Sequence, residues 1–186
     1  MRPLASAEAF AAEATPQRLA MALAAVLACY LAVVFVHAPI EAALRATPCD
    51  GLACLRSQRP DTLYGGYGAA DFRVYLDAVW GLRGRALVGL AVDLPLIAAM
   101  TAALLLAAGL AAPPALPLAD RTRRLLVIMP LAYAASDLTE NTLLALAYAG
   151  MADVALLVPW ASALKFGTAV ASGAVSLILG LMRAMT

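Results

Sequence analysis

The chain has 186 residues, of which 64% are hydrophobic and only 13% are charged, and its formal net charge is +1. With a mean hydropathy of +0.86, a soluble globular domain is excluded, because it would have no place for so much apolar surface. The near-neutral charge gives no sign of a nucleic-acid partner. Because the composition is so apolar, the first partner to expect is a lipid bilayer.

Four segments of the chain meet the requirement for a membrane-spanning helix, which is roughly 20 mostly apolar residues. They are Leu19–Ala38, Ala86–Leu110, Leu125–Ala149 and Val154–Met182. We therefore predict an all-α fold, a four-transmembrane-helix bundle that forms a single membrane domain over residues 1–186. A long external loop over residues 39–84 is expected between the first two spans.

Residues 1–18 are predicted to form a cytoplasmic segment, in which Ala5–Leu19 could be a short surface helix. A secretory signal peptide is the alternative for the first span. Its apolar stretch, however, exceeds the roughly 7 to 15 residues of a signal-peptide core, and Glu8 and Glu13 occupy what should be a basic region. We expect a retained membrane anchor.

The external loop contains Cys49 and Cys54 on either side of a turn-like Asp50-Gly51. A disulfide would be stable in an oxidising compartment, and two free thiols are the alternative. A zinc site needs four ligands, and the only histidine, His37, lies apart. The sequence thus predicts a disulfide and points to no metal or cofactor.

The end of the same loop is amphipathic. Phe72, Leu76, Val79 and Trp80 recur at helical spacing over residues 69–82, and an aromatic residue just before a span suits the membrane interface. We predict a short interfacial helix, which could be a lid over an external cavity or simply an anchoring connector.

Arginines set the expected orientation. Arg121, Arg123 and Arg124 lie between the second and third spans, whereas the short loop 150–153 has no basic residue. Short loops rich in arginine stay in the cytoplasm. We therefore expect a multi-pass protein whose termini are both cytoplasmic.

The last span contains small residues at spacings that allow helix backbones to approach closely. They are Ser162, Gly167, Ala171, Ser172, Ser176 and Gly180. This face could pack within the molecule, or it could join a homo-oligomer or a larger membrane complex.

Ionisable side chains inside the predicted spans are the strongest functional signal. A charge at the bilayer centre costs about 2.5 to 3.5 kcal/mol, so such residues usually face a protein interior or a water-filled cavity. At a rise of about 1.5 Å per residue, the four candidates fall at similar depth. They are Asp93, Asp137, Glu140 and Lys165.

The third span places its polar residues on one face, because Tyr133, Asp137, Glu140 and Asn141 are three or four residues apart. Lys165 is the only lysine of the chain. We predict one polar pocket, open or nearly open to the outer side, in which the excess of acids over the single lysine leaves at least one carboxyl protonated. The structural alternative is an ion pair of Lys165 with Asp137 or Asp93 that only holds the helices in register.

Three short motifs are similar to those of a group of bacterial four-helix integral membrane proteins. They are Arg85 with Asp93 and Pro95 in the second span, the D-x-x-E-N sequence from Asp137 to Asn141 in the third, and Lys165 in the fourth. The likeness covers roughly Tyr64 to Arg183. It implies a bacterial inner-membrane location, a four-helix architecture and a polar site, and no particular reaction.

Three functional classes follow from these observations. The first is binding or movement of a proton, ion or small polar ligand. The second is a membrane-embedded enzyme that acts on a lipid or isoprenoid by carboxyl acid–base chemistry, and the third is an accessory subunit of a larger membrane complex. No metalloprotease, serine-hydrolase or P-loop motif is present, so the sequence leaves open whether the protein is an enzyme.

Overall fold

The computed structural model describes residues 2–46, 67–112 and 120–185, and every helix or strand assigned in these ranges is a helix. The elements in chain order are α1 (Arg2–Ala12), α2 (Pro16–Ala46), α3 (Ala69–Val79), the 3₁₀ turn η3 (Trp80–Leu82), α4 (Arg83–Ala111), α5 (Asp120–Tyr148) and α6 (Val158–Ala184). The all-α prediction is confirmed.

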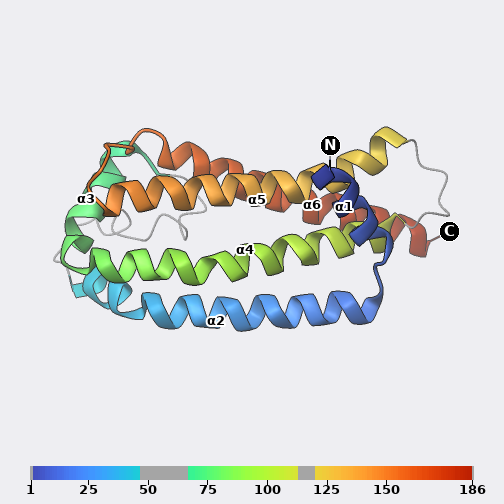
Figure 1. The fold of residues 1–186 in the computed structure, drawn as a ribbon, viewed down its shortest axis with the longest axis horizontal. Helices are drawn as coiled ribbons and strands as arrows, with labels where there is room; N and C mark the ends of the chain where they lie inside the picture. The colour runs from blue at the N-terminus through green and yellow to red at the C-terminus, as the bar shows by residue number, and fades with distance from the viewer. Residues whose placement is uncertain (1, 47–66, 113–119, 186) are drawn as a thin grey trace.

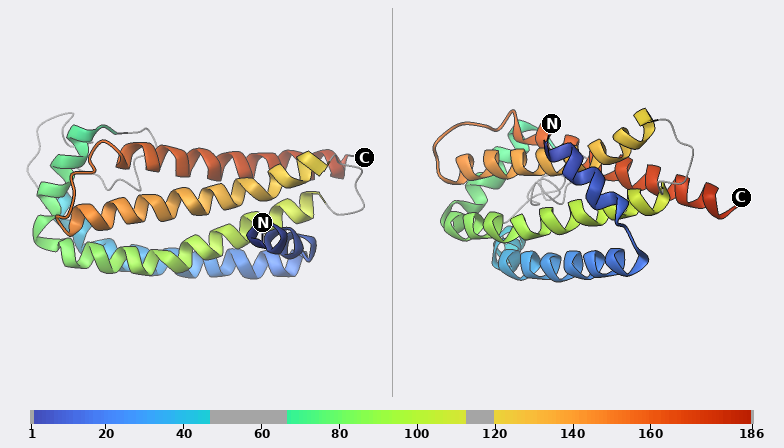
Figure 2. Two further views of the ribbon diagram at one scale, coloured as in Figure 1. Left: turned by 45° about the horizontal axis from the view of Figure 1, so that its top comes forward. Right: turned by 45° about the vertical axis from the view of Figure 1, so that its right-hand side comes forward.

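The four long helices α2, α4, α5 and α6 run alternately along the length of the molecule (Figure 1). The helix α3 lies at one end, which we call the α3 end, and both termini lie at the other, which we call the terminal end. Helices α4, α5 and α6 pack against one another, whereas α2 packs mainly on α4, on the side away from α5 and α6 (Figure 2). The architecture is therefore a three-helix group with a fourth long helix on its flank.

Three helical segments within the described ranges are long and apolar enough to cross a membrane: Pro16–Ala46, Ala69–Ala111 and Val158–Ala184. The helix α5 has the length but not the apolarity, because it contains Asp137, Glu140 and Asn141. Large apolar side chains cover the outside of the described helices; Phe35 of α2, for instance, is 81% exposed. Such a surface would be unstable in water and suits lipid.

The ends of the predicted spans shift by a few residues. The helix α2 does not stop at Ala38 but continues through Pro39 to Ala46, so the predicted loop begins later than expected. Proline removes one hydrogen bond from a helix, but here Ile40 and Leu44 on the next turns are buried at the α3 end. Their burial keeps the helix intact beyond the proline.

The N-terminal segment is helical, but its boundaries differ from the predicted 5–19. The helix α1 ends at Ala12, and α2 begins at Pro16, where proline is well tolerated because the first helical turn has no partner for its amide groups. In Gly109 of α4, an added Cβ would lie 1.9 Å from the carbonyl oxygen of Ala11. Only glycine permits this close approach of α1 to α4.

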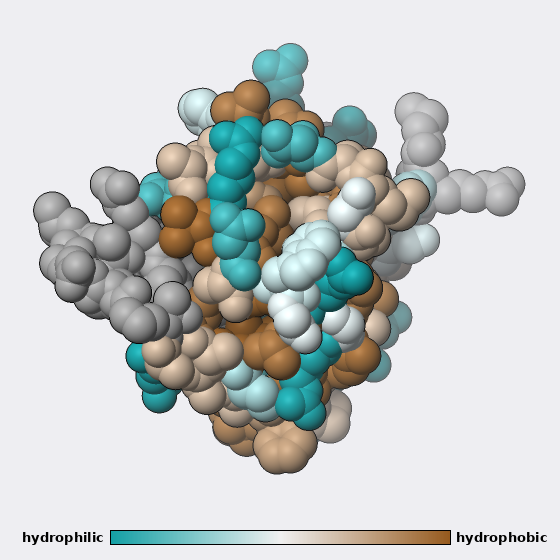
Figure 3. All heavy atoms as spheres, turned by 90° about the vertical axis from the view of Figure 1, so that its left-hand side faces the viewer, coloured by the Kyte–Doolittle hydropathy of each residue, from teal (hydrophilic) through white to brown (hydrophobic). Residues whose placement is uncertain are grey.

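The helix α3 covers the end of the α5–α6 hairpin. Its residues Phe72, Tyr75 and Val79 are buried, and the hydroxyls of Tyr75 and Tyr148 are hydrogen-bonded at 2.7 Å. The interfacial face predicted for this segment is thus packed inside the molecule, except that Trp80 is half exposed. Figure 3 looks onto this end, where hydrophilic and hydrophobic side chains lie side by side.

The small residues of α6 divide into two groups. Ser162, Ser172 and Ser176 are buried, whereas a Cβ added to Gly167 or Gly180 would meet open space. The serines thus provide the packing within the molecule, and an oligomer contact through the glycines stays a prediction. Cys49 and Cys54 lie outside the described residues, so the structure gives the predicted disulfide no support.

Candidate functional site

The centre of the site is the ammonium group of Lys165 on α6. It contacts two carboxylates of α5: Oδ1 of Asp137 at 3.1 Å, and Oε2 of Glu140 at a shorter distance. The side chain of Glu140 is fully buried, and those of Asp137 and Lys165 are 5% and 12% exposed. One cation is thus shared by two acids inside the protein.

A chain of hydrogen bonds leads from Glu140 toward the α3 end. The hydroxyl of Ser162 lies within hydrogen-bonding distance of Oε1 of Glu140 and is 2.8 Å from the hydroxyl of Tyr67, just before α3. A serine hydroxyl has one proton to donate. If Ser162 donates to Glu140, then Tyr67 donates to Ser162.

The helix α4 joins the site through a second contact. The side-chain amide of Asn141 donates a hydrogen bond of 2.9 Å to Oδ2 of Asp93. On the other side, the hydroxyl of Tyr133 is hydrogen-bonded to Asp137, and Tyr133 and Asn141 are both buried. The polar group therefore links all three helices of the three-helix group.

Helical spacing explains why these side chains converge. Asp137, Glu140 and Asn141 occupy the face of α5 that packs inward, while Leu138 and Thr139 between them are exposed. On α6, Ser162 and Lys165 are three residues apart and face the same way. Counted at about 1.5 Å per residue, Asp93, Glu140 and Lys165 lie about 10 to 15 Å from the α3 end of their helices.

The structure brings all six residues predicted from sequence into one network of ion pairs and hydrogen bonds. Ser162 and Tyr67 extend this network from Glu140 toward the α3 end. Whether a pocket opens to the outer side stays a prediction. Sequence reasoning considered Ser162 only as a small residue and did not consider Tyr67. The position of Ser162 one turn before Lys165 was a usable signal, whereas nothing local marks Tyr67.

The net charge of the buried acids and Lys165 limits the chemistry that this site can perform. With all groups ionised, Asp137, Glu140 and Lys165 carry a net charge of −1, and Asp93 adds a further acid next to them. An uncompensated charge is costly to bury. Because the carboxyls outnumber the ammonium, one bound proton would neutralise Asp137, Glu140 and Lys165, and a second would neutralise Asp93. Within the described residues, no three His, Cys, Asp or Glu side chains are arranged to hold a metal ion.

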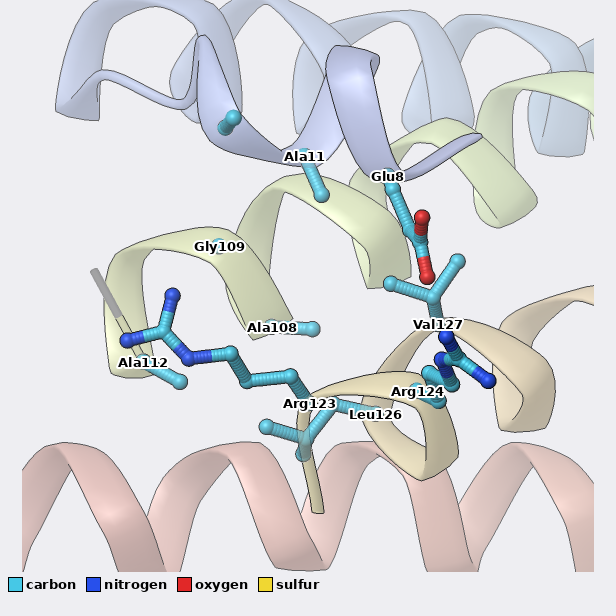
Figure 4. A pocket seen from close by; sticks show the side chains of 10 residues that line it. Glu8, Ala11, Ala108, Gly109, Ala112, Arg123, Arg124, Leu126 and Val127 are labelled. Atoms are coloured by element: carbon cyan, nitrogen blue, oxygen red, sulfur yellow. The ribbon is translucent and has the colours of Figure 1, made fainter. Parts of the chain in front are cut away.

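A separate hollow lies at the terminal end, far along the helices from Lys165. It has a volume of about 410 Å³ and is bounded by α1, α4 and α5, with Glu8, Arg123 and Arg124 among its lining residues (Figure 4). The three arginines expected in a loop are therefore part of α5, which begins at Asp120.

Comparison of the chain with protein-family models, curated proteins and solved structures gives no match. Function is therefore inferred from the geometry of the chain alone.

Proposed function

We propose that the protein crosses the membrane with α2, α4, α5 and α6, and that the network of Asp137, Glu140 and Lys165 holds an exchangeable proton. Uptake and release of this proton would move the proton itself, or would be coupled to the movement of a small polar solute. The observation that supports this best is the sharing of one buried ammonium by two buried carboxylates.

A purely structural role would need only one acid. A lysine and a single carboxylate suffice to hold two helices in register, and a second carboxylate beside them adds an unbalanced negative charge. Asp137 and Glu140 both contact Lys165, so the group is neutral only when one proton is bound. A site with this property changes its charge when the proton leaves, which is what proton-coupled membrane proteins require.

Access is proposed from the α3 end, through Tyr67 and Ser162. Tyr67 is only partly buried, Ser162 is buried, and each hydroxyl lies within hydrogen-bonding distance of the next group. In this relay a proton reaches Tyr67 from water, the proton of Tyr67 passes to Ser162, and that of Ser162 passes to Glu140. Reversal of the sequence returns the proton to water.

The test is proton exchange by the purified full-length protein in liposomes. Infrared difference spectra between acidic and alkaline buffer should contain the carbonyl band of a protonated carboxylic acid. The component of this band that comes from a buried acid should be lost in Glu140→Gln and kept in Asp153→Asn, whose carboxylate lies at the surface. Spectra without a buried-acid component, or a component unchanged in Glu140→Gln and Asp137→Asn alike, would refute the proposal.

The relay has its own readout, the rate of exchange. Tyr67→Phe and Ser162→Ala remove one hydroxyl each and leave the acids in place. Both should slow the pH-jump response of the carboxylic-acid band by about a hundredfold or more, because positioned proton transfer typically contributes roughly 10²- to 10⁴-fold. The amplitude of the band should stay the same. Tyr75→Phe, which removes a buried hydroxyl outside the relay, is the matched control.

A further inference from the structure

The hollow at the terminal end is lined by three charged side chains together with small and apolar residues. Its lining residues come from three helices: Glu8, Ala11 and Ala12 of α1, Ala108 and Gly109 of α4 with Ala112 just after it, and Arg123, Arg124, Leu126 and Val127 of α5. Figure 4 shows the side chains of Glu8 and Arg124 on one side of the hollow, and the guanidinium of Arg123 on the other.

Helix α1 is a fixed wall of this hollow. Ala7 and Ala11 are buried against Leu105 of α4 and Val127 of α5, and the missing side chain of Gly109 lets α1 approach the backbone of α4. The space between the helices is therefore set by apolar packing that does not involve the charged residues.

Two of the charged groups are without partners. Among the residues that the structure describes, neither Glu8 nor Arg124 forms an ion pair or a side-chain hydrogen bond. One is an anion and the other a cation, and both line the same hollow. The complementary ligand has one group of each sign a few ångströms apart, above an apolar part.

We propose that this hollow binds the headgroup of phosphatidylethanolamine. Arg124 takes the phosphate, because guanidinium groups form bidentate hydrogen bonds with phosphate oxygens. The carboxylate of Glu8 takes the primary ammonium, and Ala108, Leu126 and their neighbours contact the glycerol and the start of the acyl chains. The site lies where α4 ends and α5 begins, which is the headgroup level if these helices cross the bilayer.

This assignment needs only that α4 and α5 span the membrane, and it does not depend on proton exchange. It separates phosphatidylethanolamine from two close relatives. Phosphatidylcholine has the same phosphate and the same charges, but its quaternary ammonium has no N–H to donate to Glu8. Phosphatidylglycerol has the phosphate and no cation for Glu8 to bind.

The experiment is native mass spectrometry of the full-length protein in detergent, with the three lipids supplied at equal concentration and with matched acyl chains. Phosphatidylethanolamine should be retained about tenfold over each of the other two, which corresponds to 1.4 kcal/mol. Glu8→Gln should remove the preference over phosphatidylcholine, Glu8→Asp should keep it, and Arg124→Gln should lower retention of all three lipids.

Arg121→Gln is the matched control, because Arg121 is exposed on the same turn of α5 and does not line the hollow. Equal retention of the three lipids, or the same loss in Arg121→Gln as in Arg124→Gln, would overturn the assignment. Glycerophosphoethanolamine, which lacks acyl chains, tests the source of the headgroup. If it competes as well as the lipid does, the ligand is a soluble molecule and the lipid assignment is wrong.

Discussion

Replacement of Lys165 by methionine gives the sharpest test of the buried network. The variant keeps the length of the side chain and removes the cation that both Asp137 and Glu140 contact. Removal of one partner from a buried ion pair costs about 3 to 5 kcal/mol, because the other charge is left without compensation. The three side chains are 0 to 12% exposed, so both ion pairs of Lys165 count as buried. The unfolding constant should rise by about two to nearly four powers of ten.

A triple variant separates the charge from the packing. Asp137→Asn and Glu140→Gln, combined with Lys165→Met, remove all three charges while the shapes of the side chains stay nearly the same. Neutral replacement of buried ion pairs is often close to energetically neutral, so the triple variant should recover most of the stability that Lys165→Met loses. The two acid substitutions together should thus be stabilising in the methionine background.

Unfolding by dodecyl sulfate in mixed micelles is a suitable assay. The reporter is the fluorescence of Trp80, whose ring stacks against the guanidinium of Arg83 at 4.3 Å from its centroid. Trp160 is replaced by phenylalanine throughout, because it is 78% exposed and would report on the micelle. The reasoning is refuted if Lys165→Met unfolds at the same denaturant fraction as the parent protein, or if the triple variant is no more stable than Lys165→Met.

Two other features can be tested by proteolysis and by hydrogen exchange. Gly109→Ala places a methyl group against the backbone of α1, so α1 should detach and the chain should become sensitive to protease near residue 13, while Gly173→Ala, where the added atom meets open space, should have no effect. The backbone amide of Ala155 and the guanidinium of Arg73 hold the pKa of Asp153 below its usual value. Because the folded pKa is the lower one, this stabilisation is present above the unfolded pKa of about 4 and is lost as the pH falls through the folded pKa. The protection of the α3 amides from hydrogen exchange, measured relative to the intrinsic exchange rate at each pH, should therefore fall in that acidic range in the parent protein. A similar fall in Asp153→Asn would contradict the assignment.

Composition and helical spacing predicted the part of the fold that depends on local pattern. Each predicted span contains a long helix, and the three- and four-residue spacing of Asp137, Glu140 and Asn141 placed these groups on one buried face. Long-range contacts were outside the reach of sequence. Tyr67 reaches Ser162 across 95 positions of the chain, and no local pattern encodes that contact.

The sequence also did not predict where α2 ends or which side chains lie next to each other in the fold. The first span was predicted to end at Ala38, but burial of Ile40 and Leu44 keeps α2 helical beyond Pro39. Gly89 of α4 gave no signal, although the ring of His37 occupies the space of its missing side chain. In both cases the arrangement depends on tertiary packing, which local propensity does not encode.

If the four long helices span the membrane as proposed, the flanking position of α2 and the charged face of α5 have a consequence for the order in which they insert during synthesis. Because α2 is apolar on nearly all sides, it can move from the translocon into the lipid by itself, before α4 is inserted. The helix α5 cannot do so, because its two acids would each face hydrocarbon at a cost of about 2.5 to 3.5 kcal/mol. It is best released together with α6, whose lysine compensates that charge, so the last two helices are expected to insert as one hairpin.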